Sequence, residues 1–226
     1  MTDGKPPRTE AKRPTRSRLK RILAIVVIVL LGGLAAILVL GLLPLPTRGL
    51  EAQPDPARSY QEAVGRFQEV EQAEQGLVNE LGHSRMLGHG EKTPRAYLLV
   101  HGTTNSPEQW QELGETLHKL GHNVVIPRMP YHGLTSHRVS ELKRLSTQDL
   151  SAYADQAVDI AAGLGDEIVV VGISGGGAVA SWMAQNRSEV DRALLLAPFY
   201  GVHGVPDFAG TFLMNAFSRL PNVVLD

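Results

Sequence analysis

The chain has no cysteine among its 226 residues. This absence excludes a disulfide framework, cysteine ligands for zinc and a lipid anchor attached through cysteine. Residues 22–43 also lack any charged or strongly polar side chain. As a helix, this run would be about 33 Å long at roughly 1.5 Å per residue, which is enough to cross the hydrocarbon core of a bilayer. Within it, Gly32 and Ala36 form a small-xxx-small pair, a pattern too common in membrane helices to decide whether the chain self-associates.

Three interpretations of this apolar run are open: an uncleaved membrane anchor, a cleaved signal peptide, and a buried helix of a soluble protein. The apolar region of a cleaved signal is normally about 7–15 residues long and is followed by a small-x-small cleavage site. Here the run is longer, and Pro44-Leu45-Pro46-Thr47-Arg48 follows it. The sequence therefore favours a single-pass membrane anchor, that is, a signal-anchor.

The charges are distributed unevenly, although the formal net charge of the chain is only −1. Residues 1–21 contain eight lysines and arginines against Asp3 and Glu10, whereas the remaining 205 residues carry a net charge of −7. A basic tail before an apolar span indicates membrane topology rather than a nucleic-acid partner. The positive charge predicts that residues 1–21 lie in the cytoplasm and that the C-terminal domain lies on the extracytoplasmic side.

The pattern of residues divides the chain into five predicted parts. Tyr60, Val64, Phe67 and Val70 recur at helical spacing with Glu and Gln between them, which predicts an amphipathic helix. We expect this helix to pack on the domain or to lie near the membrane surface, without a part in the chemistry. The parts are a basic tail (1–21), a transmembrane helix (22–43), a proline-rich linker (44–57), the amphipathic helix (58–80) and an α/β domain (81–226).

From about residue 95 onwards, short apolar runs alternate with amphipathic segments. Ser106 is placed to cap a helix that has Pro107 in its first turn, and Gln109 completes a capping box. Strands alternating with helices predict a parallel sheet covered on both faces, and continuous apolar runs predict that its strands are buried. We expect strands at 96–100, 123–126, 167–171 and 193–196, and longer helices at 148–164 and 176–185.

One of these strands runs into a sharp turn with a serine at its apex. Residues 168–171 read IVVV and residues 172–176 read GISGG. This is a G-x-S-x-G pattern between a strand and a helix, the context in which a serine is held on a strained turn with its hydroxyl exposed. Gly172 and Gly176 keep side chains out of a place where strand and helix nearly touch. Ser174 is therefore the candidate nucleophile.

A second polar loop, residues 101–107 with the sequence HGTTNSP, directly follows the strand at 96–100. Open α/β sheets bind their ligands at the carboxyl ends of the strands. An acyl-transfer enzyme needs two backbone N–H donors aimed at the oxyanion. In a serine turn of this kind, one donor is the residue after the serine, Gly175, and the other lies in the loop after an earlier strand, here Thr103. Gly102 lets that backbone approach the substrate.

Two alternatives to a nucleophilic Ser174 are a dinucleotide-binding turn and a purely structural turn. Residues 175–180 fit a loose G-x-G-x-x-A dinucleotide-binding pattern, but the next strand ends in Ala197-Pro198 instead of the acid that this pattern requires. A buried serine in a purely structural turn is the other alternative. A serine with glycines on both sides, between a strand and a helix, favours the hydrolytic interpretation.

The histidines near these motifs are expected to be structural. His101 and His132 lie near the candidate site, and we expect them to shape loops rather than to transfer protons. His83 and His89 are six residues apart in a glycine-rich stretch, without further ligands at a spacing typical of a metal site. We therefore predict no metal ion.

Taken together, the motifs HGTTNSP and GISGGG, with the sequence PRMPYHG at 127–133 between them, resemble the α/β-hydrolase superfamily. Within it, the chain is similar to the bacterial monoacylglycerol lipases and carboxylesterases, over roughly residues 80–205. The resemblance implies a doubly wound, mostly parallel sheet, and a serine esterase or lipase-like enzyme that cleaves a small-molecule or lipid ester. It implies water as the second substrate and no metal or organic cofactor. The residues it assigns are the nucleophile Ser174, the oxyanion donors Thr103 and Gly175, the elbow glycines Gly172 and Gly176, and His101 and Gly102 of the substrate loop.

The chain departs from this family after Ser174. Such enzymes need an acid and then a histidine, in that order, after the serine. Only one strand, at 193–196, follows the serine, and the single histidine, His203, precedes Asp207. We therefore expect His203 to lie in a surface loop, the sheet to be incomplete at its C-terminal side with an exposed edge at 193–196, and the base and acid to lie outside this chain. The alternative to an active hydrolase is a catalytically incomplete remnant, acting as a binding module or without function.

Overall fold

The computed structural model describes residues 16–136, 139–201, 204–217 and 219. The chain forms two compact units. Unit 1 comprises Met1–Pro46 and His203–Asp226, and unit 2 comprises Thr47–Val202. His203, the one histidine that follows Ser174 in the sequence, lies outside the described residues.

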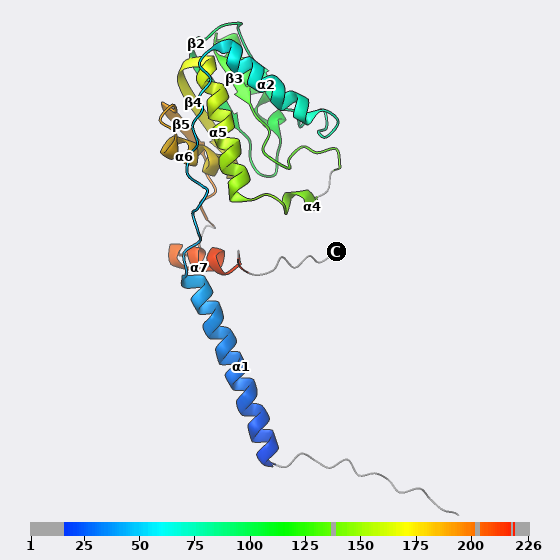
Figure 1. The fold of residues 1–226 in the computed structure, drawn as a ribbon, viewed down its shortest axis with the longest axis vertical. Coiled ribbons are helices and arrows are strands. Elements are labelled where there is room, and N and C mark those ends of the chain that lie inside the picture. Colours follow the sequence, from blue (N-terminus) through cyan, green and yellow to red (C-terminus); the bar gives the residue numbers. More distant parts are fainter. Residues whose placement is uncertain (1–15, 137–138, 202–203, 218, 220–226) are drawn as a thin grey trace, which may run out of the picture. The chain divides into compact units, whose positions relative to one another are not determined.

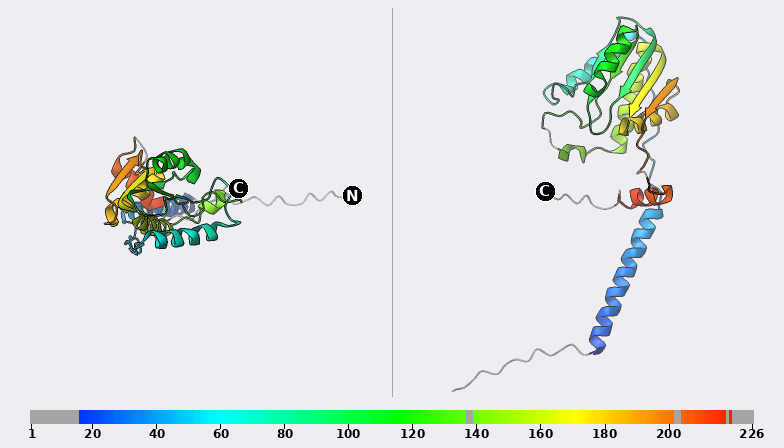
Figure 2. Two further views of the ribbon diagram at one scale, coloured as in Figure 1. Left: turned by 90° about the horizontal axis from the view of Figure 1, so that it is seen from above. Right: turned by 180° about the vertical axis from the view of Figure 1, so that it is seen from behind.

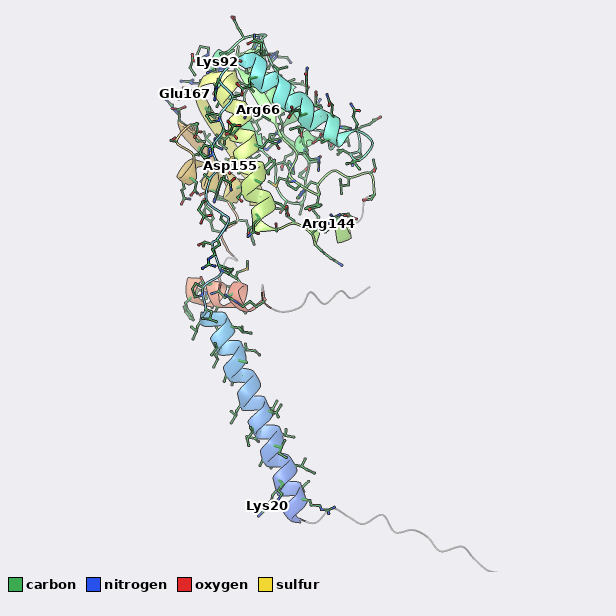
Figure 3. The ribbon with its side chains drawn as sticks, in the orientation of Figure 1. Lys20, Arg66, Lys92, Arg144, Asp155 and Glu167 are labelled. Atoms are coloured by element: carbon green, nitrogen blue, oxygen red, sulfur yellow. The ribbon has the colours of Figure 1, made fainter. Side chains whose placement is uncertain are left out.

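Two helices make up most of the described part of unit 1: α1 (Arg16–Leu42) and α7 (Asp207–Phe217). Within the ranges that the structure describes, α1 is the one helix long and apolar enough to cross a membrane, a test that an anchor and an N-terminal signal sequence both pass. Figure 3 draws its apolar side chains, with Lys20 near the basic end. The observed helix thus contains almost all of the apolar run at 22–43.

The end of α1 is capped by residues of the same unit. An α-helix leaves its last four carbonyl groups without intrahelical partners. Here the Asn215 amide donates to the Gly41 carbonyl (3.1 Å), and the Arg219 guanidinium donates to the Leu40 carbonyl (3.1 Å). A Cβ atom at Gly41 would overlap the Phe212 ring, so the absence of a side chain lets this ring pack against the backbone.

Unit 2 is built around a sheet of five strands: β1 (Arg85–Leu87), β2 (Thr93–Val100), β3 (Asn123–Ile126), β4 (Gly165–Ile173) and β5 (Arg192–Leu196). Their order in the sheet is β1-β3-β2-β4-β5. β1 pairs with β3 in antiparallel fashion, and the pairs β3–β2, β2–β4 and β4–β5 are parallel. The predicted α/β class with a mostly parallel sheet is therefore confirmed.

Helical segments lie on both faces of this sheet: α2 (Tyr60–Glu74), η1 (Pro107–Trp110), α3 (Gln111–Lys119), α5 (Thr147–Leu164) and α6 (Gly175–Asn186). A further short helix, α4 (Val139–Leu142), precedes α5. Successive side chains of a strand point to opposite faces. In β4, Ile168 and Val170 join α2, α5 and α6 in one apolar cluster, seen from its helical side in Figure 1. Val169 and Val171 join Trp110 in a second cluster, on the face seen from behind in Figure 2. The central strand is thus buried on both sides, as its continuous apolar sequence predicts.

The helix α2 packs closely on α5. Ala63 and Phe67 of α2 are buried in the same cluster as α5. At the crossing point α5 carries Gly163, where a Cβ atom would lie 2.7 Å from the Ala63 Cβ. The N-cap residue of α5, Ser146, forms a complete capping box, in which Ser146 and Asp149 bond each other's backbone N–H.

The strand β5 lies at the edge of the sheet and is exposed, although its sequence RALLL is apolar. Leu194 is 51% exposed and Leu196 is 44% exposed. The edge expected at 193–196 is thereby confirmed for the described residues.

Candidate active site at the carboxyl ends of β2 and β4

The two loops predicted to carry the chemistry meet because of the register between two neighbouring strands. In the parallel pair β2–β4, Val100 lies opposite Gly172. The residues that follow this pair, His101–Thr103 after β2 and Ile173–Gly175 at the end of β4, therefore lie side by side. A Cβ atom at Gly102 would lie 3.6 Å from the Ser174 Cβ, which is ordinary contact.

Ser174 stands on a strained turn between β4 and α6. Its φ of 55° and ψ of −123° lie in a backbone region that residues other than glycine rarely adopt. Such a conformation costs about 1–3 kcal/mol of stability. Ser174 is exposed, whereas Val171 and Gly172 of β4 are buried. The turn thus holds the hydroxyl above the sheet, as the G-x-S-x-G pattern requires.

Backbone hydrogen bonds hold the strained turn from the side of β5. The Ser174 N–H donates to the Leu196 carbonyl (3.0 Å), and the Ser174 carbonyl accepts from the Phe199 N–H (3.0 Å). Tight packing holds it from below. A Cβ atom at Gly172 would overlap the Gly176 carbonyl oxygen, and one at Gly176 would overlap the His101 carbonyl oxygen. Both elbow positions thus have no space for a side chain.

Two backbone N–H groups beside Ser174 are free to donate. Gly175 is the first residue of α6, so its N–H has no partner within the helix. Neither this N–H nor that of Thr103 donates to another described residue. The two residues are in contact, because a Cβ atom at Gly175 would lie 3.2 Å from the Thr103 Oγ1. The N-terminus of α6 also carries the positive end of the helix dipole, which favours negative charge.

Gln109 holds the loop that contains Gly102, a role that the sequence did not indicate. Its Oε1 accepts a hydrogen bond from the Gly102 N–H (2.9 Å). The predicted capping box was wrong: Ser106 makes no side-chain cap, and its hydroxyl donates to the Leu81 carbonyl (3.1 Å) instead. Pro107 opens a 3-10 turn rather than an α-helix, so the geometry of an α-helical cap is not formed. The Gln109 side chain, which the sequence assigns to a capping box, thereby fixes the loop beside Ser174.

His132 fastens the carbonyl side of the same loop. Its Nε2 lies 2.8 Å from the Thr103 carbonyl oxygen, and its Nδ1 lies 2.9 Å from the Pro130 carbonyl oxygen. The ring is 4% exposed. Both ring nitrogens of His132 thus face backbone carbonyl oxygens. His132 thus orients the Thr103 peptide rather than facing the Ser174 hydroxyl.

An ion pair between a buried carboxylate and a partly buried arginine holds the loop that carries His132. The Arg128 Nε donates to the Glu74 carboxylate at the end of α2 (2.9 Å), and Arg128 also donates to the His132 carbonyl (3.1 Å). The same carboxylate accepts from the Ser84 hydroxyl (2.7 Å) and N–H (2.8 Å). α2 was expected to take no part in the chemistry, and it contributes the carboxylate behind this loop. Residues 54 positions apart share no local sequence motif, so the sequence does not indicate this pair.

His101 is a buried structural group next to the site. Its Nδ1 donates to the Gly102 carbonyl (2.9 Å), and its Nε2 accepts from the Met129 N–H (3.0 Å). Burial lowers the pKa of His101 from 6.5 to about 4, with only partial compensation from the bond to Gly102. The ring is therefore neutral at pH 7 and links the two loops that flank the serine turn.

An apolar cavity of about 280 Å³ lies beside the free N–H groups. Its wall includes Thr103 and Gly175 on the side of the serine turn, and Leu50, Leu150 and Trp182 elsewhere. A larger hollow of about 710 Å³, lined by charged and polar groups, lies along α2 and α5 and includes neither Thr103 nor Gly175. A third hollow, of about 320 Å³, is lined by Thr103 but not by Gly175. Of these three, the apolar cavity is thus the one lined by both candidate oxyanion donors.

The described residues supply neither a base for Ser174 nor a metal site. None of the described histidines forms a hydrogen bond with the Ser174 hydroxyl. No group of three or more histidine or acidic side chains in the described ranges is arranged to hold a metal ion. His89 stacks on His118, and His83 lies 3.5 Å from the Glu74 carboxylate.

Comparison with known proteins identifies a lipase relative. Over 102 residues, the chain is 28% identical to the thermostable monoacylglycerol lipase of Bacillus sp. (strain H-257). The match covers 45% of this chain and 40% of the lipase, so the chain spans less than half the length of this curated relative.

Solved structures that match part of this chain include lipolytic enzymes and an esterase. The structure of the metagenome-derived lipolytic enzymes LipS and LipT matches with 22% identity and a TM-score of 0.42, over 50% of this chain and 44% of that one. The phosphonate-inhibited esterase B of Lactobacillus rhamnosis matches with 15% identity and a TM-score of 0.34, over 71% and 64% of the two chains. MenH of S. aureus matches with 19% identity and a TM-score of 0.36, over 53% and 44%.

The family itself is decided by a match that begins within β2 and includes β3, β4 and β5. The model of the alpha/beta hydrolase family matches residues 97–225, more than half of the chain. The match includes both candidate loops, with Thr103 and Ser174, and the helices between them. The chain therefore belongs to the alpha/beta hydrolase family.

Proposed function

We propose that this protein is a membrane-anchored serine hydrolase that cleaves carboxylic esters through an acyl-Ser174 intermediate. One observation carries the proposal: an exposed serine on a strained turn, with the free N–H groups of Thr103 and Gly175 beside it. Glycine adopts positive φ readily and would form the same turn at a lower cost. The turn itself therefore does not require a serine. A hydroxyl group held there at a cost supports a chemical role.

The proposed reaction has two steps. The Ser174 Oγ attacks the ester carbonyl carbon and forms an Oγ–C bond, while the N–H groups of Thr103 and Gly175 stabilise the negative charge on the carbonyl oxygen. The C–O bond to the alcohol then breaks, and the alcohol leaves with the proton taken from Ser174. Water next attacks the acyl-serine, which releases the acid and restores the hydroxyl group. A histidine oriented by an acid is the base that this chemistry uses, and we propose that these groups lie beyond the described residues.

The substrate is proposed to be a small-molecule or lipid ester with an apolar acyl chain. The apolar cavity beside Thr103 and Gly175 supports this, because an acyl chain that enters it places its carbonyl group next to the two donors. The similarity to a monoacylglycerol lipase supports the same class of substrate. No metal or organic cofactor takes part in the proposed steps.

A fluorophosphonate probe tests the nucleophile directly. The Ser174 Oγ would form a bond to phosphorus and displace fluoride, which leaves with the serine proton. We expect the full-length protein to be labelled at Ser174, Ser174→Ala to be unlabelled, and the exposed serine variant Ser188→Ala to be labelled like the wild type. Mass spectrometry of the labelled peptide locates the adduct. Labelling of Ser174→Ala equal to that of the wild type, or none of the wild type, would contradict the proposal.

A second candidate function is a non-catalytic binding module. It is favoured by the absence, among the residues described, of a histidine bonded to Ser174. Without its base, such a site retains only about 10³–10⁴-fold catalysis over water. Turnover of a simple ester that is lost in Ser174→Ala would exclude this candidate. Binding of an ester without turnover would support it.

The proposed topology places residues 1–21 in the cytoplasm and the hydrolase domain on the extracytoplasmic side. The basic tail before the apolar helix supports it through the positive-inside rule. Because the chain has no cysteine, single cysteines can report on each side. In intact cells, we expect a membrane-impermeant maleimide to modify Lys119→Cys, at the exposed end of α3, but not Thr9→Cys. The reverse pattern would contradict this orientation, and loss of the first 43 residues from the mature protein would show a cleaved signal.

A further inference from the structure

The segment between the apolar helix and the hydrolase domain, expected to be a linker, is bound along α5. We call residues 49–57 the strap. The Gln53 N–H donates to the Asp155 carboxylate (2.9 Å), the Asp55 N–H donates to the Asp159 carboxylate (3.1 Å), and the Ala57 N–H donates to the Asp159 carbonyl (2.9 Å). Figure 1 shows this segment in blue, running beside α5.

The spacing of the N–H groups along the strap matches the spacing of their acceptors along α5. From Gln53 to Asp55, two extended residues advance about 6.6 Å at roughly 3.3 Å each. From Asp155 to Asp159, four helical residues advance about 6 Å at roughly 1.5 Å each. Alternate N–H groups of the strap therefore meet the same face of α5 one turn apart. Because of this repeat, the strap is bound to unit 2 through successive hydrogen bonds.

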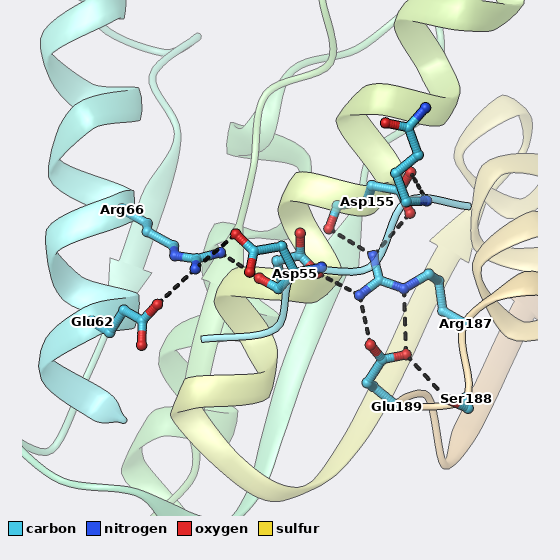
Figure 4. Close-up of polar contacts among 9 residues, drawn as sticks. Asp55, Glu62, Arg66, Asp155, Arg187, Ser188 and Glu189 are labelled. Atoms are coloured by element: carbon cyan, nitrogen blue, oxygen red, sulfur yellow. Dashed lines mark hydrogen bonds and ion pairs between the residues drawn. The ribbon is translucent and has the colours of Figure 1, made fainter. Parts of the chain in front are cut away.

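The two carboxylates that receive the strap are themselves fixed by a buried guanidinium, Arg187. Its Nη1 donates to the Asp155 carboxylate (2.9 Å), and its Nη2 donates to the carboxylates of Glu189 (2.8 Å) and Asp159. Figure 4 shows this cluster. The Arg187 side chain has no exposed surface. Burial alone lowers the pKa of the Arg187 guanidinium, but the bonds to Glu189 and Asp159 raise it above its ordinary value overall. A buried charge is tolerated only when it is paired in this way, so both aspartates are held in one orientation.

A second arginine holds the strap from the opposite side. Arg66 of α2 contacts the carbonyl and the carboxylate of Asp55, and it also pairs with Glu62 at 2.6 Å. Figure 3 labels Arg66 and Asp155 on the two helices that flank the strap. The strap is therefore clamped between α2 and α5 at Asp55.

The other end of the strap reaches the apolar cavity beside the serine turn. A tight turn, in which the Leu50 N–H donates to the Thr47 carbonyl (3.2 Å) and Gly49 has a φ of +76°, precedes the clamped region. Leu50 is half-buried and lines the cavity together with Trp182. Leu50 lies before the stretch 97–225 that matches the family model, so this part of the wall comes from residues outside the matched stretch.

We propose that Leu50 determines the acyl-chain specificity of this enzyme: the clamped strap places its side chain in the wall of the cavity and thereby limits the acyl chains that fit. The proposal rests on the proposed ester hydrolysis at Ser174, since it assigns the cavity to the acyl group of that substrate. A larger side chain at position 50 excludes long chains, whereas a smaller one admits them. Short chains, which do not reach Leu50, are unaffected by either change.

A series of alkyl fluorophosphonates tests this on the full-length protein in lipid nanodiscs. The rate of Ser174 labelling is measured with ethyl and dodecyl probes for the wild type, Leu50→Trp and Leu50→Ala. The matched control is Leu120→Trp, at an exposed leucine that does not line the cavity. We expect Leu50→Trp to lower the dodecyl-to-ethyl ratio about tenfold, equivalent to about 1.4 kcal/mol, and Leu50→Ala to raise it. A ratio in Leu50→Trp equal to that in Leu120→Trp would overturn the proposal.

A binding measurement separates this proposal from the proposed chemistry. In Ser174→Ala, binding of dansyl-undecanoic acid is followed by fluorescence, with and without Leu50→Trp. We expect the added tryptophan to weaken binding about tenfold, and unchanged binding would overturn the role of Leu50. If no probe labels Ser174 in the wild type, the hydrolase proposal fails, and the binding result still decides whether Leu50 controls the cavity.

Discussion

Two neighbouring strands of the sheet, β4 and β5, have similar apolar sequences and opposite surroundings. They pair in parallel, with Val170 opposite Ala193 and Val171 opposite Leu194. β4 lies between β2 and β5 and is covered on both faces, so Val170 has no exposed surface. β5 lies at the edge, and Leu194 is half exposed. The difference shows that an apolar run identifies a strand, whereas burial depends on which elements surround it.

The candidate active site lies on the boundary between these two environments. Ser174 extends from the buried strand, but its N–H is held by the Leu196 carbonyl at the end of the exposed one. The Phe199 N–H, just after β5, holds its carbonyl. The strained turn therefore takes its position from β4 and part of its support from β5. Substitutions on the two strands should separate these contributions.

The largest expected difference comes from truncating one large side chain on each strand. Ile168→Ala on β4 removes a buried side chain and should lower the free energy of unfolding by about 2–5 kcal/mol. Leu194→Ala on β5 removes an exposed one and should change it by less than about 0.5 kcal/mol. Urea unfolding followed by tryptophan fluorescence measures both. Equal losses would show that β5 is covered in solution.

The buried side of the sheet should also give a pH dependence, through His101 at the end of β2. The pKa of this histidine is about 4 in the folded protein because of burial, and 6.5 is its ordinary value. Above pH 6.5 it is neutral in both states. As the pH falls from 6.5 to 4, the unfolded chain takes up a proton that the folded chain does not. Stability should therefore fall by about 3 kcal/mol over that range.

The variant His101→Gln isolates this contribution, because glutamine does not titrate. The difference in unfolding free energy between the wild type and His101→Gln should shrink steadily as the pH is lowered from 7 to 4.5. A difference that is constant with pH would show that the histidine is not desolvated in the fold.

A smaller effect is expected from adding one methyl group at the elbow end of β4. In Gly172→Ala, the new Cβ meets the Gly176 backbone and lies 2.7 Å from the Ala180 Cβ. Such overpacking should cost about 1–3 kcal/mol and slow the labelling of Ser174. The control Gly65→Ala, in α2 where the added Cβ has open space, should instead stabilise the protein by about 0.5–1 kcal/mol. Similar changes in both variants would refute the tight contact between strand and helix.

Adding a charge to the edge strand β5 should have the smallest effect on folding. It should have a clear effect on association. An exposed apolar edge strand pairs readily with other chains, and lysine on an edge opposes such pairing. Leu194→Lys should leave the unfolding free energy within about 0.5 kcal/mol and slow aggregation, measured by light scattering. Leu120→Lys, at an exposed leucine away from the edge, serves as the control. Equal aggregation of Leu194→Lys and the wild type would show that the edge is already protected.

Much of the site was predictable, because its parts are local patterns. The strand-turn-helix around Ser174 and the loop with Thr103 are short motifs, and parallel pairing of their strands brings them together. The supports of the site were not predictable. Gln109 was assigned to a capping box, and the pair of Glu74 and Arg128 joins residues that no local pattern connects. Hydrogen bonds between distant segments depend on how the chain packs.

The strap shows the same limit in another part of the chain. Proline-rich residues 44–57 read as a linker, because prolines stiffen a chain and remove hydrogen-bond donors. In the structure, the free N–H groups between the prolines bind carboxylates on α5. These carboxylates face the strap because Arg187, far along the sequence, holds them. Amino-acid composition alone does not reveal such a distant partner.

The sequence by itself determined the α/β class, the apolar N-terminal helix and the serine turn, because periodicity, glycine spacing and length act over a few neighbouring residues. Only the tertiary structure decided which apolar strand is buried, what holds the Thr103 and Ser174 loops together, and that Leu50 lines a cavity beside them. The physical reason is that burial and long-range hydrogen bonds are properties of pairs of segments. They exist only once the chain has brought those segments into contact.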